Sequence, residues 1–296
     1  MKTFAKSLIA AVVTGMAFGS VQAAEITTWG FTLDSGFINW APTPGVTGSN
    51  PNSFLSSSNA SIPTQSGGSV NFATIGDVPS TLSWGSYPQS SLSVGGGSAG
   101  HFAGSLTTNG AAVTTATLTH VNNIITGTSL TSATLFDVLY LDPNGAAPPD
   151  AFQVPALSFA IRFAETSNLG SASQCQTTYG VPGGTLCEDI FAIDVAGAGF
   201  NPADNSLNQT FVFADFSYNA KIFINGLTQL NAKECQTVYG DTNHANCIGF
   251  ITNEGVTNNF TVKLQITDKP YNVPEPGTLV LLGGALLGLG GLRRRS

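Results

Sequence analysis

The sequence predicts an all-β fold, an antiparallel β-sandwich or jelly-roll-like arrangement, and three observations support it. Apolar and polar residues alternate over short runs, which is the pattern of half-buried strands. Clusters of Gly, Pro and Asn separate these runs, and no helical pattern lies between them. Only 9% of the 296 residues are charged, whereas exposed helices usually carry many Glu, Lys and Arg residues.

The clearest predicted strand is residues 259–266, where Phe, Val, Leu and Ile at even positions face one side. The same alternation predicts strands at residues 193–195, 210–216 and 218–224. Residues 113–125 are rich in Thr, Val and Ile, which suit a pleated surface.

Residues 25–271 are the expected ectodomain, and they are long enough to bury a core as one large domain or two smaller ones. Turn-forming residues gather at 42–52 and at 142–150. The Pro-rich stretch 143–155 is the candidate seam between two β-domains.

Residues 1–24 have the pattern of a secretory signal peptide. Lys2 and Lys6 precede an apolar stretch at residues 8–18, which is too short to span a bilayer. Val21-Gln22-Ala23 ends in the small residues that signal peptidase requires. We therefore expect a signal helix that is cleaved during export.

The C-terminal residues 272–296 combine three features in a fixed order. Pro274-Glu275-Pro276 comes first, the apolar run 277–292 follows, and Arg293-Arg294-Arg295 ends the segment before a final serine. A helix over the apolar run would cover about 24 Å, which is short of the roughly 30 Å hydrocarbon core. The arginines should stay on the cytoplasmic side. The segment is therefore expected to insert transiently into the inner membrane as a short hydrophobic, transmembrane-like helix.

This tail resembles the PEP-CTERM sorting signal of Gram-negative bacteria. The resemblance implies recognition by an exosortase and cleavage near Pro274-Glu275-Pro276. It also implies a final location at the cell surface or outside the cell, in bacteria that make exopolysaccharide and a biofilm matrix. Signal peptidase and exosortase are then the expected processing partners.

The charge balance of the chain between its two terminal segments is strongly acidic. Residues 24–272 contain five Lys or Arg and sixteen Asp or Glu, a net charge of −11. Such a surface repels phosphate, so the sequence excludes nucleic acid as a partner. A polybasic membrane-binding patch is absent from these residues for the same reason.

The four cysteines form a repeat. Cys175 and Cys187 are twelve positions apart, Cys235 and Cys247 have the same spacing, and the two copies are offset by sixty residues. Export places the thiols in an oxidising compartment, where disulfides form. Three pairings are possible, and the repeat favours Cys175–Cys187 with Cys235–Cys247. A zinc site formed by Cys235, His244 and Cys247 is the alternative, although its spacing matches no common zinc motif.

A second resemblance covers residues 25–270. Thr119-His120-Val121-Asn122, Glu165-Thr166 and the segments 187–191 and 247–255 occur in an ordered series. The series resembles the THxN family of PEP-CTERM proteins, which implies a fold and a location but no established activity. On a strand, His120 and Asn122 share one face and Thr119 takes the other. We expect the buried pair to satisfy internal hydrogen bonds, with ligand contact or metal binding as alternatives.

The sequence predicts no catalytic residue, cofactor site or metal site. Residues 96–100 match the G-x-S-x-G pattern but lack the strand before and the helix after that a nucleophile elbow needs. The oxygen-rich segment 142–150 is a weak candidate for Ca²⁺. A glycosidase needs a pair of carboxylates. The candidate acids for such a pair are Glu188, Asp189, Asp194, Asp215 and Glu254.

The expected function is that of an exported, non-enzymatic protein of the cell surface or extracellular matrix, associated with exopolysaccharide. One alternative is a glycan-binding module in which Trp40, Trp84 or Tyr87 stacks on sugar rings. The other alternative is a secreted hydrolase that uses Glu188 and Glu254.

Overall fold

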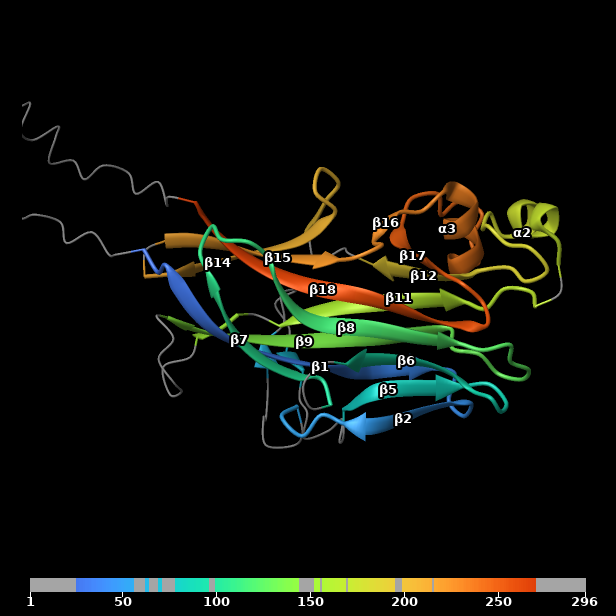
Figure 1. Cartoon of the computed structure of the whole chain (residues 1–296), viewed down its shortest axis with the longest axis horizontal. Helices are drawn as coiled ribbons and strands as arrows, with labels where there is room; N and C mark the ends of the chain where they lie inside the picture. The colour runs from blue at the N-terminus through green and yellow to red at the C-terminus, as the bar shows by residue number, and fades with distance from the viewer. Residues whose placement is uncertain are drawn as a thin grey trace, which may run out of the picture.

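A computed structural model of the chain consists mainly of two antiparallel β-sheets that form a sandwich (Figure 1), which confirms the predicted fold class. The structure describes residues 25–55, 62–63, 69–70, 78–95, 99–143, 152–154, 156–168, 170–194, 199–214 and 216–269. The signal peptide and the sorting tail with its predicted hydrophobic helix lie outside these residues. Among the described residues, no helix is long and apolar enough to cross a membrane.

The first sheet, sheet A, has the strand order β16-β17-β12-β11-β9-β1-β7, and β10 pairs with β9. The strands in this order are β16 (Thr228–Gln229), β17 (Ile248–Thr252), β12 (Asp189–Asp194), β11 (Leu157–Ala164), β9 (Ser132–Pro143), β1 (Thr28–Ala41), β7 (His101–Thr107) and β10 (Phe152–Gln153).

The second sheet, sheet B, has the order β13-β14-β15-β18-β8-β6-β5-β2. Its strands are β13 (Gly199–Asn201), β14 (Ser206–Phe213), β15 (Phe216–Ile224), β18 (Val256–Lys269), β8 (Val113–Asn122), β6 (Ser90–Gly95), β5 (Pro79–Trp84) and β2 (Val46–Pro51). Strands β3 (Ile62–Pro63) and β4 (Ser69–Val70) pair with each other in a separate two-stranded sheet. Both sheets combine strands from before and after the candidate seam at 143–155, so the described residues share one sandwich.

The core lies between the sheets and follows the two-residue period of the strands. In β11, Leu157, Phe159, Ile161 and Phe163 are buried, and the residues that alternate with them face outward. Strand β18 buries Phe260, Leu264 and Ile266 in the same way, as the sequence predicts for 259–266. Fully burying one such side chain contributes about 1.5–3 kcal/mol.

Two short helices, α2 (Ala172–Thr178) and α3 (Ala232–Tyr239), were not predicted from the sequence. Each contains the first cysteine of a disulfide, and the bonds Cys175–Cys187 and Cys235–Cys247 confirm the predicted pairing. Because both cysteines of the alternative zinc site are oxidised, that site is excluded. A small apolar cluster that includes Cys175, Cys235 and Ile190 packs the helices against β12.

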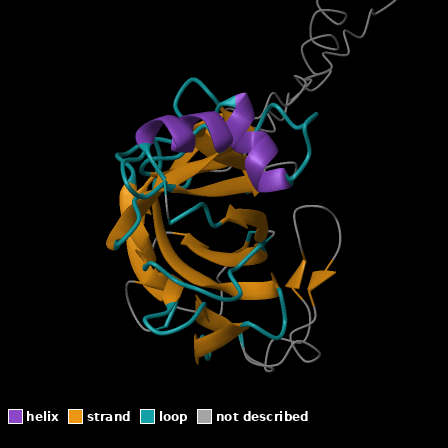
Figure 2. Ribbon diagram, turned by 90° about the vertical axis from the view of Figure 1, so that its right-hand side faces the viewer, coloured by secondary structure: helices purple, strands orange, loops and turns teal. Residues whose placement is uncertain are grey.

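The described chain begins and ends at the same end of the sandwich, opposite the two helices (Figure 1). The Ile26 backbone N–H donates to the Tyr218 hydroxyl, and Asn109 contacts Asp268 near the end of β18. Figure 2 views the molecule from the other end, where the helices lie along one side of the curved sheets. We call this the helix end.

Candidate functional site

At the helix end, inward-facing side chains form an aromatic layer followed by a polar layer. Strand register places Phe163, Phe191 and Phe250 side by side on β11, β12 and β17. His120 on β8 meets Phe163 and Phe191 from sheet B, with ring centroids 5.6 and 4.9 Å apart. Residues two apart on a strand share a face. Two residues from these rings, on the same side of the layer because the strands are antiparallel, lie the polar residues Glu165, Asp189 and Thr252.

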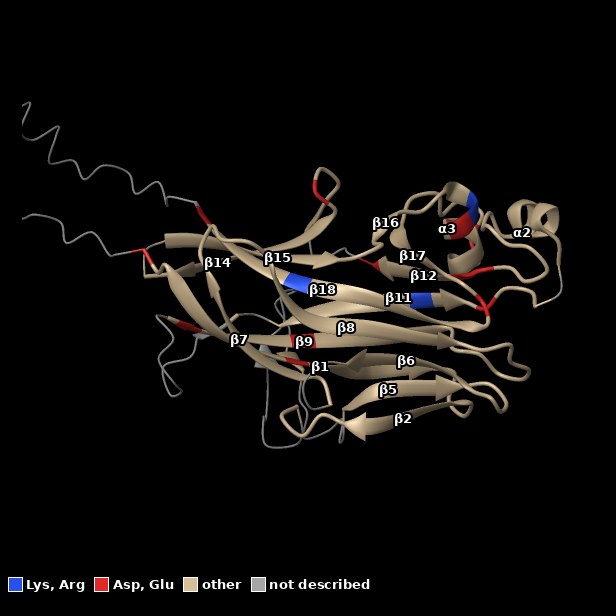
Figure 3. Ribbon diagram, viewed as in Figure 1, with Lys and Arg blue, Asp and Glu red and all other residues tan. Residues whose placement is uncertain are grey.

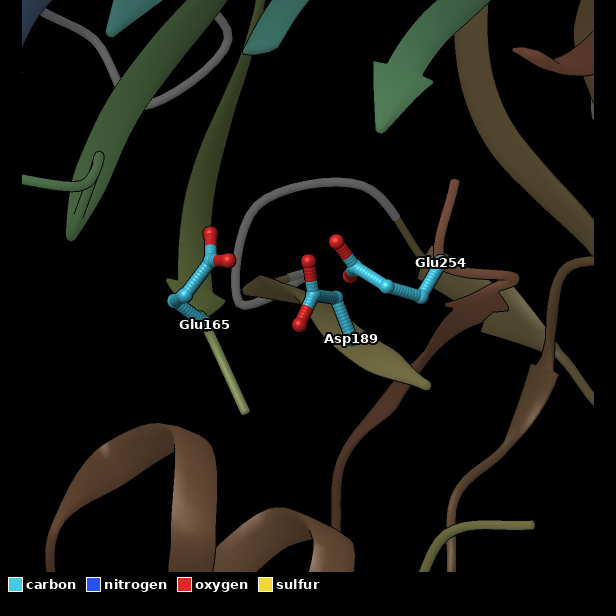
Figure 4. Close-up of side chains that lie close together, drawn as sticks. All are labelled: Glu165, Asp189 and Glu254. Atoms are coloured by element: carbon cyan, nitrogen blue, oxygen red, sulfur yellow. The ribbon is translucent and has the colours of Figure 1, made fainter. Parts of the chain in front are cut away.

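The polar layer contains three carboxylates from three separate segments. Glu165 directly follows β11, Asp189 opens β12, and Glu254 lies in the turn between β17 and β18. One oxygen from each can be chosen so that all three lie within 4.8 Å of one another. Figure 4 shows the three side chains converging on a common space. We call this group the carboxylate cluster.

The oxygens of the carboxylate cluster are shielded from solvent and mostly lack partners. Asp189 is 0% exposed, and its Oδ1 accepts a hydrogen bond from the Thr166 backbone N–H at 2.7 Å. Its Oδ2 and both carboxylate oxygens of Glu165 and Glu254 have no hydrogen-bond partner among the described residues. Burying an unpaired charge is costly, so the cluster requires protons or a cation.

The electrostatics of the three carboxyls agree with this geometry. Burial, and then the nearby charge of Glu254, raise the pKa of Glu165 to about 7. Burial also raises the pKa of Glu254 to about 7, and the Asn122 side chain offsets part of that rise. The pKa of Asp189 lies well above its usual range, chiefly because of burial and then because of the charge of Glu165.

Asn122 joins β8 to the segment that carries Glu254. Its Nδ2 donates to the carbonyl oxygens of Thr252 and Asn253, at 3.5 and 3.3 Å. Its Oδ1 is buried and has no partner among the described residues. These bonds are the internal hydrogen bonding expected for a buried Asn. Thr119 faces the other way, as expected, and donates to Asn259 Oδ1 at 2.8 Å.

His120 does not behave as expected. Both ring nitrogens are buried without a hydrogen-bond partner among the described residues. Burial lowers the pKa of His120 to about 3, so the ring is neutral at ordinary pH. The ring stacks against Trp84 at 5.6 Å between centroids. His120 therefore packs as an aromatic ring, and the expected hydrogen-bonding role applies to Asn122 alone.

The three aromatic residues considered as glycan platforms do not form an exposed row. Trp84 is 0% exposed, so the suggestion that it stacks on a sugar is wrong. Trp40 is half-buried and packs against the core, whereas Tyr87 is 96% exposed in the turn between β5 and β6. Burial of Trp84 follows from its inward position at the end of β5.

Two of the three clustered carboxylates were predicted from the sequence as candidate acids. Asp189 and Glu254 were among the candidate acids, but Glu165 was not. Its signal was the strand period, which places Glu165 on the inward face two residues after Phe163. Glu188, proposed as a partner of Glu254 in a hydrolase, is not part of the carboxylate cluster.

Other candidates lie partly outside the described residues. Asp215 and the segments 144–150 and 96–98 are not described. The expectation that no strand precedes residues 96–100 is wrong, because β6 ends at Gly95. The residues after Gly100 form strand β7 rather than a helix, which still excludes a nucleophile elbow there.

A surface groove at the helix end combines aromatic and polar side chains. Its lining includes Phe200, Tyr239 and His244 together with Asp194, Gln229 and Asn246. The rings of Tyr239 and His244 are stacked with centroids 3.6 Å apart. An apolar ring beside amide and carboxylate groups is a surface on which a sugar could rest.

One protein-family model matches the chain: the PEP-CTERM protein-sorting motif, over residues 272–295. The chain carries an exosortase sorting signal. It is therefore an exosortase-sorted protein exported to the cell surface of a Gram-negative bacterium, as the tail predicts. No curated protein matches the chain.

The sorting signal begins at residue 272, shortly after β18 ends at Lys269. Strands β11, β12 and β17, whose ends carry the carboxylate cluster, reach the opposite end of the sandwich beside the helices (Figure 1), and the groove is lined by the other end of β12 and by Tyr239 of α3. Between these ends, few of the described residues are Lys, Arg, Asp or Glu (Figure 3).

Proposed function

We propose that the exported chain is a non-enzymatic protein of the cell surface or extracellular matrix that associates with exopolysaccharide. The observation that carries the non-enzymatic part is the closure of the carboxylate cluster. A glycoside hydrolase needs two carboxyl groups about 5–10 Å apart that flank a bound sugar. The clustered oxygens lie within 4.8 Å and are shielded from solvent, so a polysaccharide does not reach them.

The outward strand surface supports association with a hydroxyl-rich polymer. On neighbouring strands β8 and β18, neutral polar side chains such as Thr119 and Asn259 face outward. Such groups exchange hydrogen bonds with sugar hydroxyls and with water at similar strength, so each contact is weak and many are needed. This favours attachment along a matrix polymer over tight capture of one small sugar.

A dedicated glycan-binding module is the second candidate function, and the groove at the helix end favours it. Tyr239 and His244 would supply the ring surface there, in place of Trp84. Helix α3, which contributes Tyr239 to the groove, lies away from the end where β18 leads to the sorting signal (Figure 1). It would therefore stay accessible while the C-terminal segment is held at the membrane.

The proposal is tested by co-sedimentation of the exported protein with exopolysaccharide from its host. We expect the protein to sediment with the polymer and to remain in the supernatant without it. His244→Ala alters the groove. Tyr87→Ala is the control, because it removes an exposed aromatic ring from a turn outside the groove.

Each outcome of this experiment is informative. Sedimentation that survives both substitutions supports diffuse association with the matrix. Loss of sedimentation in His244→Ala alone supports the glycan-binding module. If the wild-type protein never sediments with the polymer, association with exopolysaccharide is wrong.

A further inference from the structure

We propose that Glu165, Asp189 and Glu254, together with the side-chain oxygen of Asn122, form a Ca²⁺ site that joins the two sheets at the helix end. No function proposed above assigns a metal to the chain. The inference is independent of exopolysaccharide binding, and either one can fail without the other.

The carboxylate cluster is not the only observation that points to a cation. Asn122 is a neutral side chain, 0% exposed, and its Oδ1 has no partner among the described residues. Its Nδ2 is already engaged with two carbonyl oxygens, which orients the amide. The side chain lies beside both acids, because its partner Thr252 pairs with Asp189 in the register of β12 and β17, and its partner Asn253 directly precedes Glu254. A cation would satisfy an amide oxygen and carboxylates in the same place.

Trp84 and Asn168 supply a second layer around the cluster. Both side chains lie close enough to Glu165 to favour its ionised form. The Nε1 of Trp84 is buried and has no hydrogen-bond partner within the described structure. Outer groups of this kind orient the carboxylates that bind a metal. An indole N–H can only donate, so in the loaded site it would orient Glu165 and would not bind the ion.

The donor set fits Ca²⁺ better than other common cations. Ca²⁺ takes six to eight oxygen ligands at about 2.3–2.6 Å, so two of its ligands lie at most about 5 Å apart. The carboxylate oxygens, within 4.8 Å of one another, meet that limit. Mg²⁺ prefers a tighter octahedron that keeps several waters. Zn²⁺ prefers Cys and His, but all four cysteines are in disulfides.

A cation at this position would connect elements that the sheets leave separate. Asn122 ends β8 in sheet B, whereas Glu165 and Asp189 belong to neighbouring strands of sheet A. Glu254 lies where the chain passes from β17 in sheet A to β18 in sheet B. Bound Ca²⁺ would therefore hold the two sheets together beside the disulfide-bonded helices.

The first test is calorimetric titration of the exported protein with CaCl2 after EDTA treatment and desalting, at about pH 8. We expect one ion per chain, with a Kd of about 0.1–1 mM, as in extracellular modules. Glu254→Gln should weaken binding at least tenfold. Glu188→Gln is the matched control, because Glu188 neighbours Asp189 in sequence but lies outside the cluster.

Glu254→Gln should leave the protein folded, because it removes a buried charge that lacks a partner. In EDTA, Glu254→Gln should melt at the same temperature as the wild type or higher. Added Ca²⁺ should then raise the melting temperature of the wild type and of Glu188→Gln, but not that of Glu254→Gln.

A spectroscopic test places the ion beside Trp84. Tb³⁺ replaces Ca²⁺ at oxygen sites and emits when a nearby indole is excited. We expect tryptophan-sensitised Tb³⁺ emission that Ca²⁺ displaces. The emission should be lost in Trp84→Phe, which keeps Trp29 and Trp40 and should still bind Ca²⁺ by calorimetry.

Three results would overturn the proposal. One is the absence of both heat and a melting shift at about ten times the expected Kd. Another is unchanged Ca²⁺ affinity in Glu254→Gln. The third is Mg²⁺ affinity equal to that for Ca²⁺, which would contradict the identity of the ion.

Discussion

At the scale of single residues, burial has different consequences for two side chains on the same face of β8. Asn122 uses its amide to hold two carbonyl oxygens of the β17–β18 connection. His120 forms no hydrogen bond within the described structure and is packed between Trp84, Phe163 and Phe191. Two residues of one short motif therefore contribute to stability by different mechanisms.

The role of Asn122 can be measured directly. Asn122→Ala should lower the free energy of unfolding by about 1–3 kcal/mol, because the carbonyls of Thr252 and Asn253 lose a buried donor. Thr119→Ala, on the outward face of the same strand, should change it by no more than about 0.5 kcal/mol. Urea denaturation of both variants in EDTA gives the comparison. Equal effects would contradict the structural role of Asn122.

The raised carboxyl pKa values make stability depend on pH with a definite sign. Glu165 and Glu254, each with a pKa of about 7, and Asp189 bind more protons in the folded than in the unfolded state. Without divalent cations, the stabilising contribution of these carboxyls is fully present below their ordinary pKa, about 4, and is lost as pH rises through about 7. Buried Asp137, with a pKa of about 6, acts in the same direction. Buried His120 acts in the opposite direction, because its pKa is lowered from 6.5 to about 3 and it therefore destabilises the folded state as pH falls below about 6.5.

Thermal melting between these pH values tests this sign. Glu165→Gln should make the fall in melting temperature with rising pH less steep, because one titrating group is removed. A smaller fall should remain, because Asp137 still titrates. A melting temperature that rises between about pH 5 and pH 8 in EDTA would contradict the assignment.

At the scale of elements, several strands were predictable and the helices were not. The predicted strand 210–216 is wrong in its bounds, because β14 ends at Phe213 and β15 begins at Phe216. Residues 259–266 alternate clearly, and β18 extends over Val256–Lys269 around them. Helix α2 has seven residues and buries only Cys175, so no apolar stripe marks it. A usable signal was present at α3, where Asn231 and Glu234 form a capping box.

The carboxylate cluster was only partly predictable for a related reason. Glu165 directly follows β11, Asp189 opens β12 and Glu254 lies in the turn after β17, whereas the only predicted strand among these was 193–195. Their convergence depends on β11 pairing with β12, and on β12 pairing with β17. Strand order arises from packing of the whole core, and one sequence does not reveal it.

The cap of α3 carries a prediction at this scale. Asn231→Ala should destabilise the protein by about 1–2 kcal/mol, because the side chain accepts from Lys233 and Glu234 backbone N–H groups. Asn231 also donates to the Gly180 carbonyl after α2, which links the two helices. Ser171→Ala removes the cap of α2, which accepts only one backbone N–H, and should lower the free energy of unfolding by a smaller amount. Denaturant unfolding of the two variants measures this order, and the reverse order would contradict it.

At the scale of the whole molecule, the two ends of the sandwich differ in role. The described chain enters and leaves at one end, and β18 leads from there to the sorting signal at residues 272–295. The other end holds both disulfides, both described helices, the groove and the carboxylate cluster. The end away from the sorting signal is thus the more heavily cross-linked one, which suits a part exposed outside the cell.

We infer that the carboxylate cluster stabilises the sandwich when it holds Ca²⁺ and does not cleave polysaccharide. The most direct measurement is the release of new reducing ends from the host exopolysaccharide, by the wild-type protein and by Glu165→Gln and Glu254→Gln, with and without Ca²⁺. The account predicts no new ends from any of these proteins. New reducing ends that appear with the wild type and disappear in both variants would contradict it and assign the cluster to catalysis.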